Sequence, residues 1–352
     1  MSFELFFEED RQKERELLAA YDLDIKFFNK LGVRIKQIVP ERACYRIETD
    51  KGFFCLKKMN YSFQDIYLMQ EMTIHLKEHG FRSISDIVRQ PDGGILVPYL
   101  GSEYYLTQWM DGRESDYLNP ADIKEAAQAL ARLHLAAKGF GTRLNTTVRK
   151  LFGRWEEGFL QKLREIRESQ KLITTAAKER DNLQIFIDYL NSCEEDTKHS
   201  ICLLERSDYR KLNARDEKQH GFIHHDYGLY NIIHTFVGET FVGELESAAF
   251  DIRMHDLGHL IFKLMRRRDW DFEIAMNIIN YYNNIFILEK EDYEALCVYL
   301  SLPQDFKQFQ KLYYSVDRDM EDLEALERIN INSEYSIARR RFLQEIEKYS
   351  GL

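Results

Sequence analysis

The sequence predicts an α+β protein with two lobes: a small amino-terminal lobe built on an antiparallel sheet, and a large, mostly helical carboxy-terminal lobe. Two observations predict this fold class. Short segments with alternating apolar residues, separated by turn residues, fill the first third of the chain. From Asn119 onward, apolar residues recur mainly at helical spacing. A chain of 352 residues is long enough to give each lobe a core.

Composition and net charge limit the classes of molecule that the protein is expected to bind. The formal net charge is -10 and 44% of the residues are hydrophobic, as in ordinary globular proteins. Such an acidic chain is a poor candidate for binding nucleic acid or an anionic membrane, and a better one for cationic small molecules. No apolar run approaches the roughly 18 residues that a membrane helix needs. The five cysteines form no C-x-x-C pair, which favours a reducing compartment such as the cytoplasm.

The amino-terminal lobe is expected to begin after a helical segment over residues 1–32, in which residues 9–23 form a charged helix. Alternating patterns then predict strands and a hairpin, and an apolar face predicts one helix. The strands are expected over 33–39, 44–49, 53–58 and 104–110, the helix over 65–79, and the hairpin over 86–90 and 95–100.

The boundary between the lobes is expected near residues 108–112, where strand patterns give way to helical ones, so the sheet lobe spans 33–110 and the helical lobe 111–352. Asn119 and Pro120 are typical of a helix cap followed by the first helical residue. Further helices are expected over 147–170, 175–193, 195–218 and most of 270–349, with a hairpin over 232–243 and a buried helix that begins within 251–261.

One stretch of the helical lobe carries the chemistry. In residues 221–234 a short apolar run leads into His224 and Asp226, and Asn231 opens a second apolar run after a polar turn. A strand-loop-strand arrangement would place Asp226 and Asn231 on one tight loop. Such a carboxylate can take a proton from an attacking hydroxyl, and the amide oxygen can hold a magnesium ion on a nucleotide phosphate. The spacing H-x-D-x-x-x-x-N is that of kinase catalytic loops.

Lys57 lies at the end of an apolar strand, where a lysine either extends into water or binds phosphate as a point charge. On the strand alone the two interpretations are equal, and Asp226 and Asn231 favour the phosphate role. The preceding turn, 39–43, should cover the phosphates, but it contains no glycine. There Arg42 can replace backbone contacts with its guanidinium.

Two acidic residues follow the second hairpin. Glu244 stands where a kinase has its second metal-binding carboxylate, with Glu246 as a substitute or partner, although both are also consistent with solvent-facing glutamates at a strand end. Asp256 is expected to cap a helix and to hold the backbone of the catalytic loop. His134, at the end of a helix, is expected to be a hydrogen-bonded core histidine rather than a ligand. Glu71 is the nearest carboxylate on helix 65–79 to pair with the strand lysine, but it lies away from the apolar face and suits the surface better.

Together these residues resemble the aminoglycoside phosphotransferase and choline kinase superfamily, which has the protein kinase-like fold. Within it, the chain is most similar to the spore coat protein S family of endospore-forming bacteria. The resemblance extends from about Val33 to the carboxy-terminal helices and rests on the segments 55–58, 130–134, 224–231 and 250–257.

The resemblance implies an ATP-dependent phosphotransferase. Asp226 matches the catalytic base, Asn231 and Glu244 the ligands of Mg²⁺, Lys57 the phosphate lysine, and Asp256 the structural aspartate behind the loop. The linker residues Gln108, Trp109 and Met110 would face the adenine ring, beside Arg42 at the phosphates. The acceptor would be an unidentified hydroxyl on a small molecule or a protein, and the resemblance allows other spore-coat proteins as partners. It places the protein in the mother-cell cytoplasm, with assembly into the spore coat as a further option.

Three departures from the family pattern support a second interpretation. The phosphate loop has no glycine, glutamate replaces aspartate at position 244, and the family's helix glutamate falls on Met69. Glutamate is longer by one methylene, and Mg²⁺ tolerates little error in its octahedral shell. The alternative is therefore a catalytically degenerate kinase that serves as a structural component of the coat. A third interpretation is a small-molecule binding protein without chemistry.

Overall fold

The computed structural model describes most of the chain, and the predicted helix over 9–23 lies outside it except for Leu23. The described residues are 23–41, 44–59, 62–142, 144, 149–177, 184–219, 221–236, 238–243, 245–307, 310 and 323–352. The chain divides into two compact units. Unit 1 comprises Met1–Glu114 and Ile232–Glu246, and unit 2 comprises Ser115–Asn231 and Ser247–Leu352.

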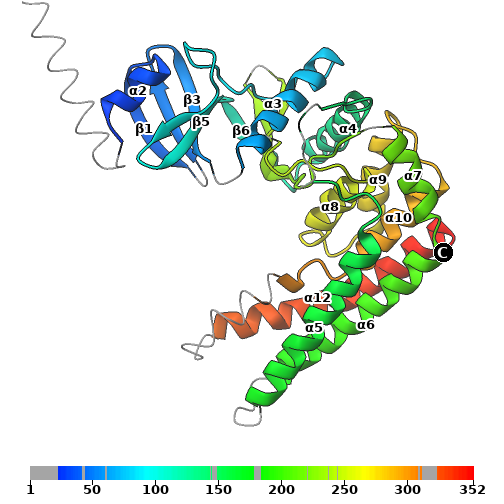
Figure 1. Ribbon diagram of the computed structural model, residues 1–352. Helices are drawn as coiled ribbons and strands as arrows, with labels where there is room; N and C mark the ends of the chain where they lie inside the picture. The colour runs from blue at the N-terminus through cyan, green and yellow to red at the C-terminus, as the bar shows by residue number, and fades with distance from the viewer. Residues whose placement is uncertain are drawn as a thin grey trace, which may run out of the picture. The chain divides into compact units, whose positions relative to one another are not determined.

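Unit 1 is built on a five-stranded antiparallel sheet with the strand order β1-β2-β3-β5-β4 (Figure 1). The strands are β1 (Ile35–Glu41), β2 (Cys44–Thr49), β3 (Gly52–Lys58), β4 (Val97–Tyr99) and β5 (Ser102–Gln108). The tight turn between β2 and β3 sets their register, because Thr49 pairs directly with Gly52. The predicted alternating strands in 33–58 are therefore confirmed.

Two helices accompany this sheet. Helix α2 (Ile25–Leu31) begins where the Asp24 carboxylate accepts a hydrogen bond from the Phe27 N–H, and it ends at Gly32 in the left-handed conformation. Its Phe27 and Phe28 are fully buried in the same apolar cluster as Ile47 and Leu56 of the sheet. Helix α3 (Phe63–Glu78) starts with a capping box, and its apolar face is buried as the sequence predicted.

The predicted hairpin over 86–100 is wrong in its pairing. Strand β4 pairs with β5, and the turn consists of Leu100 and Gly101, both with positive φ. Residues 86–90 contribute only an isolated bridge, between Ile87 and Thr107. The turn signal of 91–94 is real, since the Gln90 N–H donates to the Gly94 carbonyl, but it closes a loop and joins no two strands.

A second, three-stranded sheet in unit 1 has the order β6-β7-β8. It consists of β6 (Gly112–Glu114), β7 (Ile232–Thr235) and β8 (Thr240–Val242). The hairpin of β7 and β8 was predicted, whereas β6 was not, because three residues are too few to show a strand period. Gly112 pairs with Thr235 at the start of β6. The chain therefore returns to unit 1 directly after Asn231.

Unit 2 is helical. Its helices are α4 (Pro120–Ala136), α5 (Trp155–Ala177), α6 (Gln184–Arg206), α7 (Tyr209–Lys218), α8 (Met254–Met265), α9 (Phe272–Asn283), α10 (Lys290–Ser301) and α12 (Leu323–Ser350). Asn119 caps α4 as predicted. Helices α5 and α6 lie side by side over most of their length (Figure 1). The three helices predicted over 147–218 exist, but their ends differ, since uniformly charged surfaces give weak boundary signals.

Helix α8 forms the centre of unit 2. Most of its residues are buried, including Leu257, Leu260 and Ile261 at 0% exposure, and it contacts α4, α9 and α10. Gly258 lets the ring of Tyr299 approach closely, because an added Cβ would lie 2.4 Å from Tyr299 Cδ1. This burial fixes α8 and therefore the polar side chains that it carries.

No helix among the described residues is long and apolar enough to cross a membrane. All five cysteines lie in the described part of the chain, and none of them forms a disulfide bond. Three of them are buried, whereas Cys44 is partly buried and Cys202 is exposed.

We expect Gly112→Ala to destabilise unit 1. The new Cβ would lie 2.3 Å from the carbonyl oxygen of His234, a backbone atom that cannot move without breaking the β6–β7 pairing. The expected loss in the free energy of unfolding is about 1–3 kcal/mol, measured by urea denaturation.

The matched control is Gly158→Ala in α5, where nothing lies within 4 Å of the added atom. This variant should gain about 0.5–1 kcal/mol from helix propensity. Equal stabilities of the two variants would contradict the close approach of β6 and β7.

Candidate functional site

Residues 221–231 form the candidate catalytic loop of unit 2. Ile223 and Ala249 exchange two backbone hydrogen bonds, of 2.9 and 3.1 Å, which anchor the entry to the loop. His225 then adopts a left-handed conformation with φ 68°, an uncommon and strained choice for a side chain with a Cβ. The loop closes with a short 3-10 turn over Leu229–Asn231, in which the Asn231 N–H donates to the Gly228 carbonyl.

Asp256 on α8 holds this strained backbone. Its carboxylate is completely buried and accepts the N–H groups of His224 at 2.7 Å and His225 at 2.8 Å. Burial by itself would raise the pKa of Asp256, but the nearby His134 and His255 outweigh burial and keep this pKa well below its usual value of 3.8. The expected role of Asp256 behind the loop is therefore confirmed, whereas the predicted helix cap is not, since α8 has no side-chain cap.

His134 connects this carboxylate to the core. The imidazole lies 3.2 Å from Asp256 through Nε2 and 2.9 Å from the Tyr282 hydroxyl through Nδ1, and the residue is 4% exposed. It is a hydrogen-bonded core histidine, as predicted. Because both ring nitrogens have partners in the core, His134 restricts the position of the Asp256 carboxylate.

Asp226 follows the strained residue and extends toward solvent, with 45% of its side chain exposed. Its Oδ1 accepts a 2.5 Å hydrogen bond from the Tyr230 hydroxyl and lies 3.5 Å from His259 Nε2. Burial raises the pKa of this carboxyl, but His259 and Tyr230 outweigh burial, so the pKa lies below 3.8. Asp226 is therefore an anion at neutral pH, and no described residue is recorded as bonded to its Oδ2.

Sequence reasoning did not identify the two partners of Asp226. His259 lies three residues after Asp256 on α8, a spacing that places both side chains on one helical face. Tyr230 directly precedes Asn231, so the same turn carries both. Either spacing could have been noticed, but neither indicates contact with Asp226 until the fold is known.

A stack of imidazole rings lies over this region. His225 and His255 are parallel with centroids 4.2 Å apart, and His255 and His259 are parallel at 6.3 Å. Burial, and then the charge of His255, lower the pKa of His225 to about 4. His225 is therefore neutral at pH 7, which limits charge repulsion within the stack.

Asn231 is tied to Asp226 as the sequence predicted. Its side-chain Nδ2 donates to the Asp226 carbonyl at 2.8 Å, which leaves the amide oxygen as the group suited to a metal ion. Among the described residues, no three His, Cys, Asp or Glu side chains gather in a way that would hold a metal. The predicted pair of Asn231 and Glu244 is not covered by that finding, because Glu244 lies outside the described residues.

Lys57 is held within unit 1. Its ammonium donates to Glu246 Oε1 at 2.6 Å, and the Tyr105 hydroxyl donates to the same oxygen at 2.5 Å. Lys57 and Tyr105 are directly paired across β3 and β5, so both side chains lie on one face of the sheet. The Lys57 and Glu246 side chains are only 18% and 24% exposed. Glu246, which was predicted as a substitute or partner for Glu244 at the metal, instead pairs with Lys57 from the segment after β8.

The remaining predicted nucleotide contacts are described only in part. Arg42 lies outside the described residues. Gln108 pairs with Phe54 at the end of β5, and the Trp109 N–H donates to the Phe53 carbonyl at 3.2 Å. The Gln108 N–H donates to the Asp86 carbonyl. The backbone N–H groups of Gln108 and Trp109 therefore both have partners within the protein. Met110 is half-buried.

The sheet of unit 1, the helices of unit 2 and the loop between α7 and β7 define the protein kinase-like fold. Solved structures agree. An aminoglycoside phosphotransferase from Alicyclobacillus acidocaldarius has a TM-score of 0.78 at 19% identity, covering 94% of this chain and 96% of that one. Spectinomycin phosphotransferase, solved with ADP and spectinomycin, has a TM-score of 0.62 at 12% identity, covering 95% of this chain and 98% of that one.

Residues 41–298, more than half of the chain, match the phosphotransferase enzyme family, and the chain belongs to this family. A curated relative is spore coat protein S of Bacillus subtilis (strain 168). It is 24% identical over 310 residues, which cover 87% of this chain and 86% of the relative. The predicted family and fold class are thus confirmed.

We expect Asp256→Asn to lower the free energy of unfolding by about 3 kcal/mol at pH 7, because it removes the charge that binds two N–H groups and His134. The folded-state pKa of Asp256 lies below that of the unfolded chain. Its stabilisation is therefore present above about pH 4 and is lost as the pH falls through the folded-state pKa. The deficit of the variant should shrink toward pH 3 in urea denaturation.

Asp251→Asn is the matched control, because the pKa of Asp251 is shifted in the opposite direction to that of Asp256. Burial raises the pKa of Asp251 to about 6. The protonated acid therefore stabilises the folded chain fully below about pH 4, and this stabilisation is lost as the pH rises through 6. This variant should be more stable than wild type at pH 8 and no more stable at pH 4. Parallel pH profiles of the two variants would contradict these assignments.

Proposed function

We propose that the protein is an ATP-dependent phosphotransferase that phosphorylates a hydroxyl group on a small molecule or a protein. The observation that carries this proposal is the loop of unit 2, which carries a half-exposed Asp226 carboxylate and fixes Asn231 by a 2.8 Å hydrogen bond from its side-chain amide to the Asp226 backbone carbonyl. The same loop is held from behind by Asp256. Phosphoryl transfer needs little more from a protein than positioning and charge neutralisation.

Asp226 would accept a hydrogen bond from the acceptor hydroxyl at its Oδ2, while Tyr230 donates to Oδ1 and His259 Nε2 lies 3.5 Å from Oδ1. The hydroxyl oxygen forms the new bond to the γ-phosphorus, the bond to the ADP oxygen breaks, and the hydroxyl proton passes to Asp226. Because its pKa is low, Asp226 is a weak base that mainly orients the hydroxyl and accepts the proton late.

Lys57 would contact the phosphates, with Glu246 as the residue that positions its ammonium. A lysine oriented by a carboxylate is a recurring part of kinase sites. Asn231 and Glu244 would hold a divalent ion, which neutralises phosphate charge when bound. Arg42 would contact the phosphates, and the backbone of Gln108, Trp109 and Met110 would face the adenine.

The relatives support nucleotide and metal use in this family. Spectinomycin phosphotransferase was solved with ADP. An amicoumacin kinase solved with AMP-PNP and Ca²⁺ has a TM-score of 0.57 at 14% identity, covering 99% of this chain and 96% of that one. The likeness to spore coat protein S supports association with the bacterial spore coat, with synthesis in the mother cell and other coat proteins as partners.

We expect Mg-ATP binding, measured by isothermal titration calorimetry, to weaken about tenfold or more in Lys57→Ala and in Asn231→Ala. Each substitution removes one charged or metal-binding contact, whose free energy is expected to match that of one charge-assisted hydrogen bond. Asp226→Asn should still bind Mg-ATP but lose turnover, since it retains neither the charge nor the basicity.

Two control variants stand beside these. Lys58→Ala changes the exposed next residue of the same strand, and Asn277→Ala changes an exposed asparagine of α9. Both should bind Mg-ATP like wild type. If wild type itself binds no nucleotide at millimolar concentration, the proposed function fails.

A second candidate function is a catalytically degenerate kinase that acts as a structural component of the coat. The observations that favour it are the glutamate at position 244 and the absence of glycine from residues 39–43. A longer side chain at a magnesium site disturbs an octahedral shell that accepts little distortion.

Glu244→Asp separates the two candidates. If the site has decayed at this position, the shorter carboxylate should raise the rate of ATP turnover, measured as phosphate release, by about tenfold, as expected for restored metal geometry. Wild type that turns over ATP as fast as the substituted protein would rule out decay at position 244. Glu244→Gln is the control for loss of charge at this position.

A further inference from the structure

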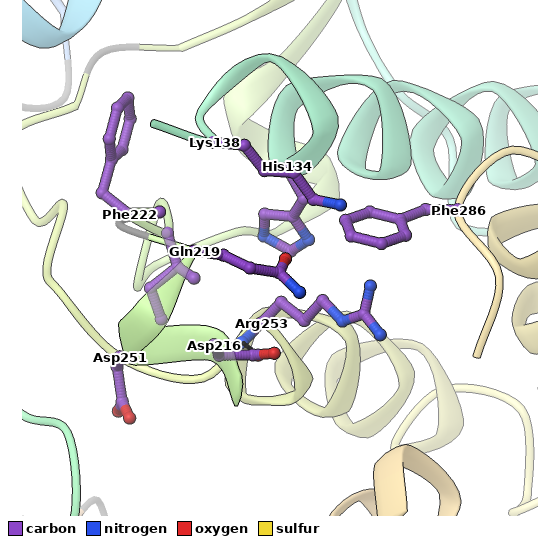
Figure 2. A pocket seen from close by; sticks show the side chains of 10 residues that line it. His134, Lys138, Asp216, Gln219, Phe222, Asp251, Arg253 and Phe286 are labelled. Atoms are coloured by element: carbon purple, nitrogen blue, oxygen red, sulfur yellow. Dashed lines mark hydrogen bonds between the residues drawn. The ribbon is translucent and has the colours of Figure 1, made fainter. Parts of the chain in front are cut away.

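Unit 2 contains a partly open pocket next to the segment that enters the candidate catalytic loop, with about 300 Å³ of empty space that includes open solvent. Its wall is formed by the end of α4, the end of α7, the segment that enters the loop, the start of α8 and the segment after α9. Figure 2 shows His134, Gln219 and Arg253 directed toward a common space, with the ring of Phe286 beside the guanidinium.

The strongest feature of this pocket is Arg253. The residue is 6% exposed, and its Nη2 donates to Asp292 Oδ2 at 2.7 Å and approaches the Ile287 carbonyl at 3.4 Å. Among the described residues, neither Nε nor Nη1 of Arg253 has a hydrogen-bond partner, although both atoms are buried. A buried guanidinium that lacks acceptors for two of its nitrogens is costly. A ligand that supplies oxygen acceptors would remove this cost.

A second cation lies close by. The ammonium of Lys138 is 4.1 Å from the centroid of the Phe286 ring, and the Arg253 guanidinium carbon is 3.8 Å from the same centroid. Burial, and then the charge of Arg253, lower the pKa of Lys138. Two cations that share one aromatic ring repel each other, and Asp216 offsets part of this repulsion at Lys138.

Both carboxylates of the pocket already have partners. Asp216 accepts from Arg215 Nε through Oδ1 and from the Arg253 backbone N–H through Oδ2. Asp251 accepts from the Ile252 N–H and from Trp155 Nε1, and its carboxylate lies apart from the other labelled side chains in Figure 2. The buried pocket atoms that lack a hydrogen-bond partner, Nε and Nη1 of Arg253, are both donors.

We propose that this pocket binds a small oxyanion, a phosphate or carboxylate group, through Arg253 and Lys138. This site is separate from the proposed nucleotide site and goes beyond the proposed function. Phe222 and Ile223 line the pocket and lead directly into His224, and His134 joins the pocket to Asp256. A bound oxyanion would thus contact the segments that hold the catalytic loop.

Inorganic phosphate is the probe, titrated into the full chain at pH 7 by isothermal titration calorimetry at constant ionic strength. We expect saturable binding that weakens about tenfold or more in Lys138→Gln, as for the loss of one charge-assisted hydrogen bond. Arg253→Gln should abolish binding. Because that variant also breaks a buried ion pair and can fail to fold, Lys138→Gln decides the test.

Two controls locate the binding. Lys124→Gln removes an exposed lysine from the other end of α4 and should leave phosphate affinity unchanged. Lys57→Ala, which affects only the proposed nucleotide site, should also leave it unchanged. Absence of saturable binding at tens of millimolar phosphate would overturn the proposal. Binding lost in Lys57→Ala but kept in Lys138→Gln would overturn it as well.

Discussion

The buried carboxylate of Asp256 is the interaction on which the candidate site depends. It accepts hydrogen bonds from the backbone N–H groups of His224 and His225. In this arrangement His225 adopts the left-handed conformation. Backbone strain of this kind costs of order 1–3 kcal/mol and persists only where surrounding contacts outweigh it. Here His134 and the largely buried α8 keep the carboxylate in place. The direction of Asp226, the next residue, follows from that arrangement.

The two units each orient a charged group by the same principle. In unit 2, the Tyr230 hydroxyl donates to one oxygen of Asp226, His259 lies 3.5 Å from the same oxygen, and both lower the pKa of this carboxyl. In unit 1, Glu246 holds the ammonium of Lys57, and Tyr105 limits the movement of that glutamate. Charged groups that are already in position need little reorganisation when a ligand binds. In enzymes that transfer phosphoryl groups, such preorganisation lowers the barrier. The departures from the family pattern at position 244 and in residues 39–43 involve none of the residues that make these two arrangements.

The core of unit 2 also links the catalytic loop to the neighbouring pocket. His134 contacts Asp256 on one side and lines the pocket on the other, while Arg253 immediately precedes α8. Arg253 is held by Asp292 of α10, so its guanidinium is placed by helix packing and not by the loop. The pocket and the loop therefore share supporting residues, but they present different chemistry: donors in the pocket and a carboxylate in the loop.

The sequence alone determined the elements whose signals are local. Alternation and tight turns predicted β1 to β3, an Asn-Pro cap predicted the start of α4, and the spacing from His224 to Asn231 predicted the loop that joins Asp226 to Asn231. Contacts between distant segments were decided only by tertiary structure. The partner of Lys57 is 189 residues away, His259 meets Asp226 only because α8 packs behind the loop, and β6 pairs with a strand far along the chain. The physical reason is that periodicity reports which face of an element is buried, whereas the packing of the whole core decides what that face meets.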